Sequence, residues 1–199
     1  KHFETISYTN EINEISKNNQ IIISVSRLTP YKGVDLLIEA FAEIELTNAR
    51  LLIVGDCGLS KKDLCYKKEL INLTKSDPRV LMLGWRDDIA ELLNLSDIFV
   101  APAIGPDPFP TTILEAMSTG LCCIVSDIGG QSEAISKESG FIFEPGNKND
   151  LKTKIISLLK NEKKRSEIGL AARARFDKEF ATKNYHSRMS VLIKNGVFY

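Results

Sequence analysis

The chain has 199 residues, of which 43% are hydrophobic and 26% are charged, the proportions of an ordinary globular domain. Its 26 Lys and Arg residues balance its 26 Asp and Glu residues, and this zero net charge argues against a broad surface for nucleic acid or membranes. No apolar run approaches the ~20 residues that span a bilayer, no signal peptide opens the sequence, and its cysteines and histidines match no zinc-binding pattern. We therefore expect a reduced, metal-free, cytoplasmic protein with no nucleic-acid partner.

Short apolar runs alternate with segments of helical periodicity along most of the chain. The apolar runs predict strands at residues 21–25, 51–54, 79–83, 97–101, 122–126 and 141–143. Apolar residues at helical spacing predict helices at 33–47, 61–76, 87–95 and 110–119, and the chain is expected to be helical from residue 150 onward. Strands that are apolar on both faces and separated by helices indicate a parallel sheet with helices on each side. The predicted fold is α/β, a Rossmann-like doubly wound parallel sheet of about six strands with C-terminal helices.

Composition also suggests how the chain is divided. The first 19 residues are polar, and we expect them to form an inter-domain linker with little structure of its own, followed by one domain at 20–199. The basic stretch at 148–165 contains interspersed acidic residues, which favours a solvated helix face over a binding patch. Cys122 and Cys123 lie in an apolar run and are interpreted as small buried hydrophobic residues.

The loop after the first predicted strand carries two cations. It reads S-R-L-T-P-Y-K-G, so Arg27 and Lys32 follow the carboxyl end of a strand, where open parallel sheets bind their ligands. An arginine can hold two oxygens at once and a lysine adds a point charge, which together suit a diphosphate. A solvated loop explains this segment alone equally well. A G-x-G-x-x-G fingerprint is absent here, which disfavours a nicotinamide-dependent dehydrogenase.

The loop after the fourth predicted strand leads into a helix start that suits an anion. It contains D-P-F-P-T-T-I-L-E, and Pro110 can occupy the first helical turn without losing a hydrogen bond. The backbone N–H groups of Thr111, Thr112 and Ile113 are then expected to be free and to point beyond the sheet. Together with the helix dipole, such groups bind anions.

Two carboxylates belong to the same segment. Glu115 lies one turn into the predicted helix, where it could accept hydrogen bonds from a ligand's hydroxyl groups, and Asp107 lies at the mouth of the loop. Each also has an ordinary structural interpretation. Glu115 can be an exposed acid near a helix N-terminus, and Asp107 can be a turn residue.

Taken together, these loops resemble the nucleotide-sugar-binding half of a GT-B glycosyltransferase, in particular the large retaining family 4, also called glycosyl transferases group 1. The similarity covers residues 21–185, with the loops in the family's order. The family's G-R-L-x-x-x-K-G segment corresponds to the loop of Arg27 and Lys32. Its V-G-D-G turn appears as V-G-D-C at 54–57, and its L-G-x-x-x-D segment, which lines the base pocket, appears at 83–88.

The hallmark of the family is a pair of glutamates within E-x-F-G-x-x-x-x-E-A-M-A, which here reads D-P-F-P-T-T-I-L-E-A-M-S. Glu115 matches the glutamate that holds the ribose hydroxyls. Asp107 replaces the glutamate that faces the transferred sugar, with the charge kept on a shorter side chain. Residues 129–133 match the family's G-G-x-x-E loop near the donor. The donor-binding set implied by the resemblance is Arg27, Lys32, Gly84, Trp85, Arg86, Asp107, Phe109, Pro110, Thr111, Thr112, Ile113 and Glu115.

The resemblance also implies a chemistry. The catalytic residues would be Arg27 and Lys32, which stabilise the departing diphosphate in place of a metal, and Asp107, which orients the sugar. The substrate would be a nucleoside diphosphate sugar, with no cofactor. GT-B enzymes have an additional N-terminal acceptor domain, so we expect this domain alone to be inactive. The full-length hexosyltransferase would act on a glycan or a lipid-linked acceptor in polysaccharide assembly. It would be cytoplasmic and could associate peripherally with the inner face of the membrane.

Three alternatives remain open at this point. A sugar phosphorylase or nucleotide-sugar epimerase shares this fold, and product analysis with and without an acceptor would separate it from a transferase. A non-catalytic nucleotide-binding module would keep the same pocket. A purely structural interaction domain would leave the set of Arg27, Lys32, Asp107 and Glu115 unexplained.

Overall fold

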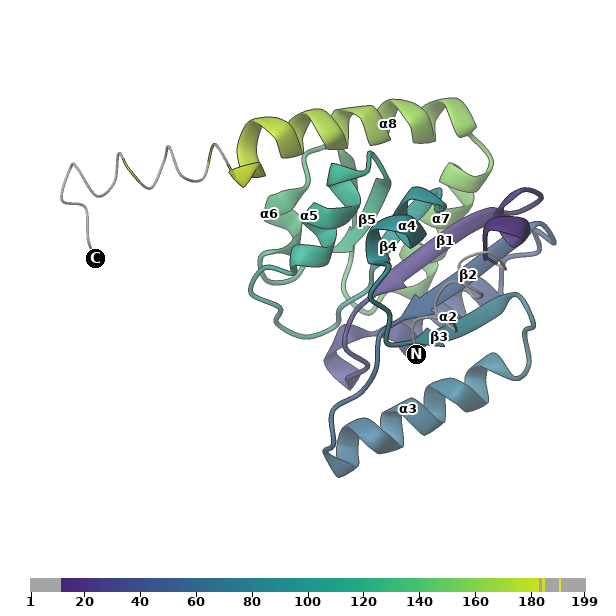
Figure 1. Ribbon diagram of the computed structural model, residues 1–199. Helices are drawn as coiled ribbons and strands as arrows, with labels where there is room; N and C mark the ends of the chain where they lie inside the picture. The colour runs from purple at the N-terminus through teal and green to yellow at the C-terminus, as the bar shows by residue number, and fades with distance from the viewer. Residues whose placement is uncertain (1–11, 183, 185–189, 191–199) are drawn as a thin grey trace.

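The computed structural model describes residues 12–182, 184 and 190, and a six-stranded parallel sheet forms its centre (Figure 1). The spatial order of the strands is β3-β2-β1-β4-β5-β6, so the chain reverses direction across the sheet between β1 and β4. The predicted Rossmann-like, doubly wound fold is confirmed. The strands are β1 (Gln20–Val25), β2 (Ala49–Val54), β3 (Val80–Gly84), β4 (Ile98–Ala101), β5 (Cys122–Ser126) and β6 (Gly140–Phe143).

Helices cover both faces of the sheet (Figure 1). Side chains from α2, α3 and α7 form the core on one face, and those from α4, α5 and α6 form the core on the other. The helices are α2 (Val34–Ala42), α3 (Lys61–Thr74), α4 (Ile89–Asn94), α5 (Thr111–Ser118), α6 (Gln131–Ala134), α7 (Lys148–Leu159) and α8 (Glu162–Arg175), with a 3-10 turn, η1 (Pro30–Lys32), and a π-helical turn, η2 (Phe176–Phe180).

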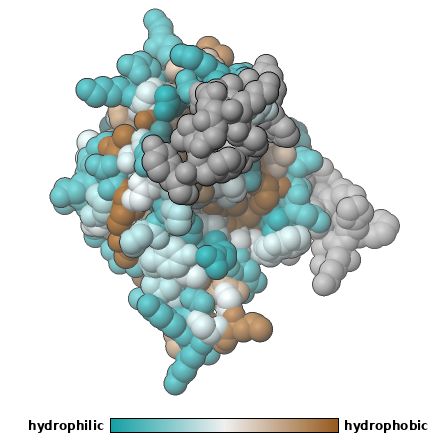
Figure 2. Space-filling view, turned by 90° about the vertical axis from the view of Figure 1, so that its left-hand side faces the viewer, coloured by the Kyte–Doolittle hydropathy of each residue, from teal (hydrophilic) through white to brown (hydrophobic). Residues whose placement is uncertain are grey.

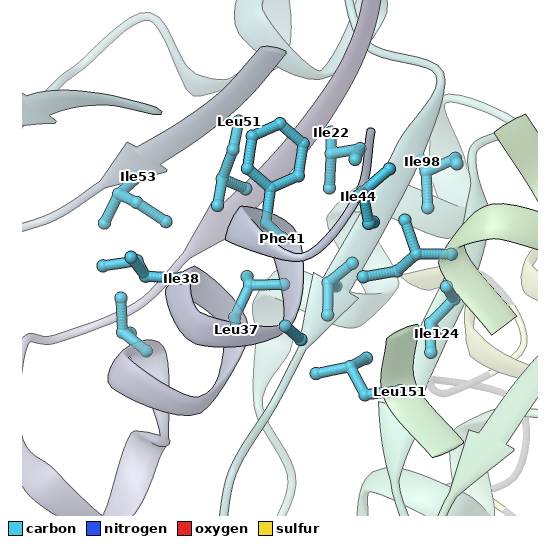
Figure 3. Packing of buried hydrophobic residues seen from close by; sticks show 14 of the residues in the cluster. Ile22, Leu37, Ile38, Phe41, Ile44, Leu51, Ile53, Ile98, Ile124 and Leu151 are labelled. Atoms are coloured by element: carbon cyan, nitrogen blue, oxygen red, sulfur yellow. The ribbon is translucent and has the colours of Figure 1, made fainter. Parts of the chain in front are cut away.

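The core forms because the apolar stripes of the helices meet strands that are buried on both sides. Phe41 of α2 is fully buried and lies over the sheet close to Ile22 and Leu51, which are opposite each other in the register of β1 and β2 (Figure 3). Complete burial of such a phenylalanine contributes roughly 2–3 kcal/mol to the free energy of unfolding. This packing fixes the strand ends from which the loops of the sheet depart.

Two predicted elements differ from the structure. The helix predicted at 33–47 ends at Ala42. Ile44 keeps the helical spacing and is buried, but it follows a turn in which its N–H donates to the Phe41 carbonyl. Residues 12–16, which were expected to lie in a linker with little structure, form a helical turn whose Ile12 is only 3% exposed. The first 11 residues and most of the predicted helix beyond 182 lie outside the described residues.

The surface is largely polar. Figure 2 shows mostly hydrophilic residues on one side of the molecule, with hydrophobic residues in separate patches between them. In the basic stretch, Lys148 and Lys152 of α7 form ion pairs with Glu43 at 2.8 and 2.5 Å, as expected for a solvated helix face. Cys122 and Cys123 are buried, as predicted. Among the described residues, no helix is long and apolar enough to cross a membrane.

Candidate functional site

A cavity of about 510 Å³ lies at the carboxyl end of the sheet. The ends of β1 and β2, the loops that follow β1, β2 and β3, and the first turns of α4 and α5 form its walls. This is the side on which open parallel sheets bind ligands, next to the reversal of strand order between β1 and β4. Of the predicted site residues, the cavity brings together Arg27, Trp85, Arg86, Thr112 and Glu115.

The loop after β1 is held close to the loop after β4. Gly33 has a φ of +65°, and a Cβ atom there would lie 2.1 Å from the carbonyl oxygen of Pro102. Only glycine fits so tight a backbone approach. Arg27 is exposed at the cavity, and its Nη2 donates to the hydroxyl of Tyr31 across 2.8 Å. The guanidinium is thus partly oriented before any ligand arrives.

Lys32 and Asp107 form an ion pair that the sequence did not predict. The Lys32 ammonium donates to Oδ2 of Asp107, 75 residues away, and both side chains are largely buried. The two residues, with Pro110 and Thr112, line a second cavity of about 10 Å³, which adjoins the larger one because Val25, Ser26 and Thr112 line both. Each charge neutralises the other, so the pair can be buried without isolating a charge.

The start of α5 corrects one prediction. Pro110 precedes the helix as its N-cap, and the N–H of Ile113 donates to the Pro110 carbonyl across 3.2 Å. The N–H of Ile113 is therefore not free, and its side chain is completely buried in the core. Thr111 is exposed, and Thr112 lines both cavities. The anion-binding end of this helix is therefore reduced to the two threonines.

Glu115 is exposed on the wall of the larger cavity, one turn into α5. Its carboxylate forms no hydrogen bond or ion pair with the part of the chain that the structure describes. The carboxylate of Glu115 is therefore free to accept hydrogen bonds from a ligand.

The predicted site residue Phe109 packs against Phe180, with ring centroids 5.9 Å apart, and lines neither cavity.

The loop after β3 supplies one flat and one charged side chain. Trp85 is 72% exposed at the cavity, whereas Arg86 is 8% exposed and donates to both oxygens of Asp88 at 2.7 and 2.5 Å. Gly84 has a φ of +68° and accepts a hydrogen bond from the Gly55 N–H, but it does not line the cavity. Arg86 therefore shapes the wall of the cavity while Asp88 neutralises its charge.

The sequence-based set missed several lining residues. Ser26, Asp56 and Cys57 follow β1 and β2 and line the larger cavity. A hydrogen bond from Lys67, 2.6 Å away, lowers the pKa of Asp56 below its ordinary value. Gln131, at the start of α6, lines the smaller cavity. Position directly after a strand is the signal that could have identified the first three residues.

Within the described residues, no group of three or more His, Cys, Asp or Glu side chains is arranged to hold a metal ion. The expectation that the site uses no metal remains a prediction. Of the cations at the cavities, Arg27 is exposed, whereas the charges of Lys32 and Arg86 are paired with those of Asp107 and Asp88. The site combines exposed positive charge, a free carboxylate and an exposed aromatic ring.

Comparison with known proteins gives a consistent result. The family model for glycosyl transferases group 1 matches residues 8–175. The chain is 31% identical over 180 residues to N-acetyl-alpha-D-glucosaminyl L-malate synthase from Bacillus anthracis, covering 89% of this chain and 46% of that protein. It is 40% identical over 136 residues to UDP-Gal:alpha-D-GlcNAc-diphosphoundecaprenol alpha-1,3-galactosyltransferase from Escherichia coli, covering 65% of this chain and 34% of that protein.

A solved structure of HepE from Anabaena, in complex with UDP-glucose, matches with a TM-score of 0.83 at 27% identity, covering 94% of this chain and 53% of that one. The chain therefore spans about half, or less, of the length of the relatives it matches. The family match extends over most of the described fold, including every loop that lines the two cavities. The chain belongs to the glycosyl transferases group 1 family.

Proposed function

We propose that residues 20–199, together with the turn at 12–16 that packs against them, form the donor-binding domain of a retaining glycosyltransferase of family 4, which an N-terminal acceptor domain would complete. The full-length enzyme would transfer a hexose from a nucleoside diphosphate sugar to a glycan or lipid-linked acceptor. One observation carries this proposal: Arg27 and Glu115 line a single cavity of about 510 Å³ beside the reversal of strand order.

The cavity offers a group for each part of such a donor. The exposed indole of Trp85 offers a flat face next to the base, and the carboxylate of Glu115 can accept hydrogen bonds from the ribose hydroxyls. Arg27, which lines the same cavity, would bind the diphosphate. Lys32 and Thr112 line the smaller cavity, and Thr111 directly precedes Thr112 as the first residue of α5. The proposal gives these groups and Arg27 the role that a metal would otherwise have at the diphosphate.

The proposed step breaks the bond between the anomeric carbon and the diphosphate oxygen, and the bonding electrons leave with the diphosphate. Positive charge develops on the sugar ring, as in other glycosyl chemistry. Arg27 and Lys32 stabilise the leaving diphosphate, and such preorganised charges act most strongly where the charge develops. Asp107 opposes the positive charge on the sugar. The acceptor hydroxyl then forms the new bond to the anomeric carbon on the same face, and its proton passes to the departing diphosphate oxygen.

The relatives support the substrate classes. The Anabaena structure contains UDP-glucose, and the Escherichia coli relative is named for a UDP-galactose donor and a diphosphoundecaprenol acceptor. A polyprenol-linked acceptor is embedded in a membrane, so the full-length enzyme is proposed to work in the cytoplasm and to associate peripherally with the inner face of the membrane. The isolated domain is proposed to be inactive in transfer, because the acceptor would bind to the other domain.

A thermal-shift titration with UDP, GDP and ADP tests the proposal. A ligand at 100 times its dissociation constant stabilises the folded state by about 2.7 kcal/mol. We expect a shift with one nucleotide that disappears in Glu115→Ala and persists in Glu69→Ala, which removes an exposed carboxylate from α3. The absence of a shift with every nucleotide, or a shift that survives in Glu115→Ala, would contradict the proposed site.

A further inference from the structure

Gln131 is a buried amide without a partner. It is the first residue of α6 and has no exposed surface, and neither its side-chain oxygen nor its nitrogen forms a hydrogen bond within the described residues. Burial of an amide without hydrogen bonds is unfavourable, and buried polar side chains in native proteins nearly always find partners. The amide is therefore placed to bind something from outside the chain.

Gln131 lines the cavity to which the proposed function assigns the sugar end of the donor. Gln131, Lys32, Asp107 and Thr112 line the cavity of about 10 Å³ next to the ends of β1 and β4. That volume is about enough for one water molecule or one hydroxyl group. Because three residues line both cavities, a ligand in the larger cavity can place one group into the smaller one.

The backbone fixes Gln131 in this position. The two preceding glycines lie against the loop of Asp107: a Cβ atom at Gly129 would be 2.2 Å from the Asp107 carbonyl oxygen, and one at Gly130 would be 1.9 Å from that of Pro108. The Gly130 N–H also donates to the Asp107 carbonyl across 3.0 Å. The segment that carries Gln131 is thereby joined to the segment that carries Asp107.

The chemistry of the amide selects the partner. A glutamine side chain offers both a donor and an acceptor, and a hydroxyl group complements both. A phosphate oxygen only accepts hydrogen bonds, so it could bind the amide N–H groups but would leave the amide carbonyl without a partner. We propose that Gln131 binds a hydroxyl group of the transferred sugar and contributes to the choice of sugar. This inference rests on the proposed function, and a bound water molecule is the competing source of the same chemistry.

Gln131→Met tests the inference because methionine keeps the length of the side chain and removes both polar atoms. Calorimetric titrations compare a nucleoside diphosphate with its nucleotide sugar. The diphosphate is chosen from UDP, GDP and ADP, and the nucleotide sugar from UDP-glucose, UDP-galactose, GDP-mannose and ADP-glucose, by binding to the unaltered chain. We expect the variant to bind the nucleotide sugar about tenfold more weakly and the diphosphate unchanged.

Ser126→Ala is the matched control. The Ser126 hydroxyl at the end of β5 is also buried without a partner, but it lines neither cavity, so both affinities should stay unchanged. Gln131→Leu is the second variant, for use if Gln131→Met unfolds.

Three other results would overturn the inference about Gln131. Unchanged affinity for the nucleotide sugar would assign the amide to water alone and overturn the inference. An equal loss for diphosphate and nucleotide sugar would make Gln131 a support of the loop and also overturn it. If the unaltered chain binds no nucleotide at all, the proposed function fails first, and the inference fails with it.

Discussion

A cavity lies at each end of the sheet, and the two ends differ in whether their buried polar side chains have hydrogen-bond or ion-pair partners. At the amino end, a cavity of about 240 Å³ is lined by residues that include Asp97, Thr119 and Arg165. Asp97 accepts a hydrogen bond from the Ile21 N–H at 2.8 Å and pairs with Arg165 at 3.3 Å, and the Thr119 hydroxyl donates to the Ala116 carbonyl. At the carboxyl end, the fully buried amide of Gln131 has no partner among the described residues.

This difference teaches that a cavity by itself does not identify a site. At the amino end the chain itself satisfies these polar groups, because Asp97 joins β1, β4 and α8. At the carboxyl end, polar groups remain available, and a ligand can satisfy them. Because unpaired buried groups are rare in folded proteins, the amide of Gln131, which also lines a cavity, is the better guide to function.

The largest expected effect is a loss of ligand affinity at the carboxyl end of the sheet. Arg27→Ala should weaken nucleoside diphosphate binding by about 2–3 kcal/mol, because it removes charge-assisted hydrogen bonds, and should change the free energy of unfolding by less than about 0.5 kcal/mol. Calorimetry and urea denaturation measure the two quantities. Lys163→Ala removes the same charge from an exposed position on α8 and should change neither. Unchanged nucleotide affinity in Arg27→Ala would remove Arg27 from the site.

The next largest effect is a loss of stability from a substitution at the amino end of the sheet. Asp97→Ala leaves the Ile21 N–H and Arg165 without their shared acceptor, so the free energy of unfolding should fall by about 1–2 kcal/mol. Nucleotide affinity should not change, because the cavity of Asp97 lies at the other end of the sheet. Asp97→Asn, which keeps an acceptor for the N–H, should lose less. Weaker nucleotide binding in a folded Asp97→Ala protein would show that the two ends are not independent.

A smaller effect concerns pH. Asp56 lines the carboxyl-end cavity, and the hydrogen bond from Lys67 holds its pKa below the ordinary value of 3.8. Because the folded-state pKa is the lower one, the pair stabilises the fold above pH 3.8, and this contribution is lost as the pH falls through the lowered pKa. The pair is partly exposed, so the change should stay below about 1 kcal/mol. Other carboxylates with lowered pKa values, such as Glu43 and Asp77, also lose stabilisation over this range, so the test is a difference. Urea denaturation at pH 6 and pH 3 should show a larger fall in the free energy of unfolding for the unaltered chain than for Lys67→Met.

The smallest effect is a difference in the rates at which the four cysteines are alkylated. Cys65 is exposed and Cys57 lines the cavity, whereas burial raises the pKa of Cys122 to about 12 and that of Cys123 well above its ordinary value. Iodoacetamide at pH 8 should label Cys65 first and the buried pair only after unfolding. A bound nucleotide should slow labelling of Cys57 and leave Cys65 unaffected. Peptide mass spectrometry measures each rate, and equal protection of both would argue against binding in the cavity.

Much of the fold could be predicted because its strands have a distinctive sequence pattern. Runs such as 122–126 are apolar on both faces, a pattern that only a strand covered on both sides explains. Helix ends were less predictable, since Ile44 keeps the helical spacing beyond the point where the helix stops. The turn at 12–16 was missed because Ile12 and Ile15 alone give too short an apolar pattern.

The site was predictable in position and less so in detail. Arg27 and Glu115 follow from their places after a strand and within a helix start, and both reach the cavity. The ion pair of Lys32 with Asp107 joins residues 75 positions apart, and only the folded chain brings them together. The sequence marks the two glycines before Gln131, but whether its amide finds a partner depends on the packing of three separate loops.

An amide chemical-shift titration with the nucleotide that gives a thermal shift tests the central claim most directly, because it reports both ends of the sheet in one experiment. We predict that the signals of Arg27, Cys57, Trp85 and Glu115, which line the carboxyl-end cavity, will move on titration. Those of the amino-end cavity, such as Asp97, Gly120 and Arg165, will stay in place. Movement concentrated at the amino end would contradict the assignment of the site to the carboxyl end.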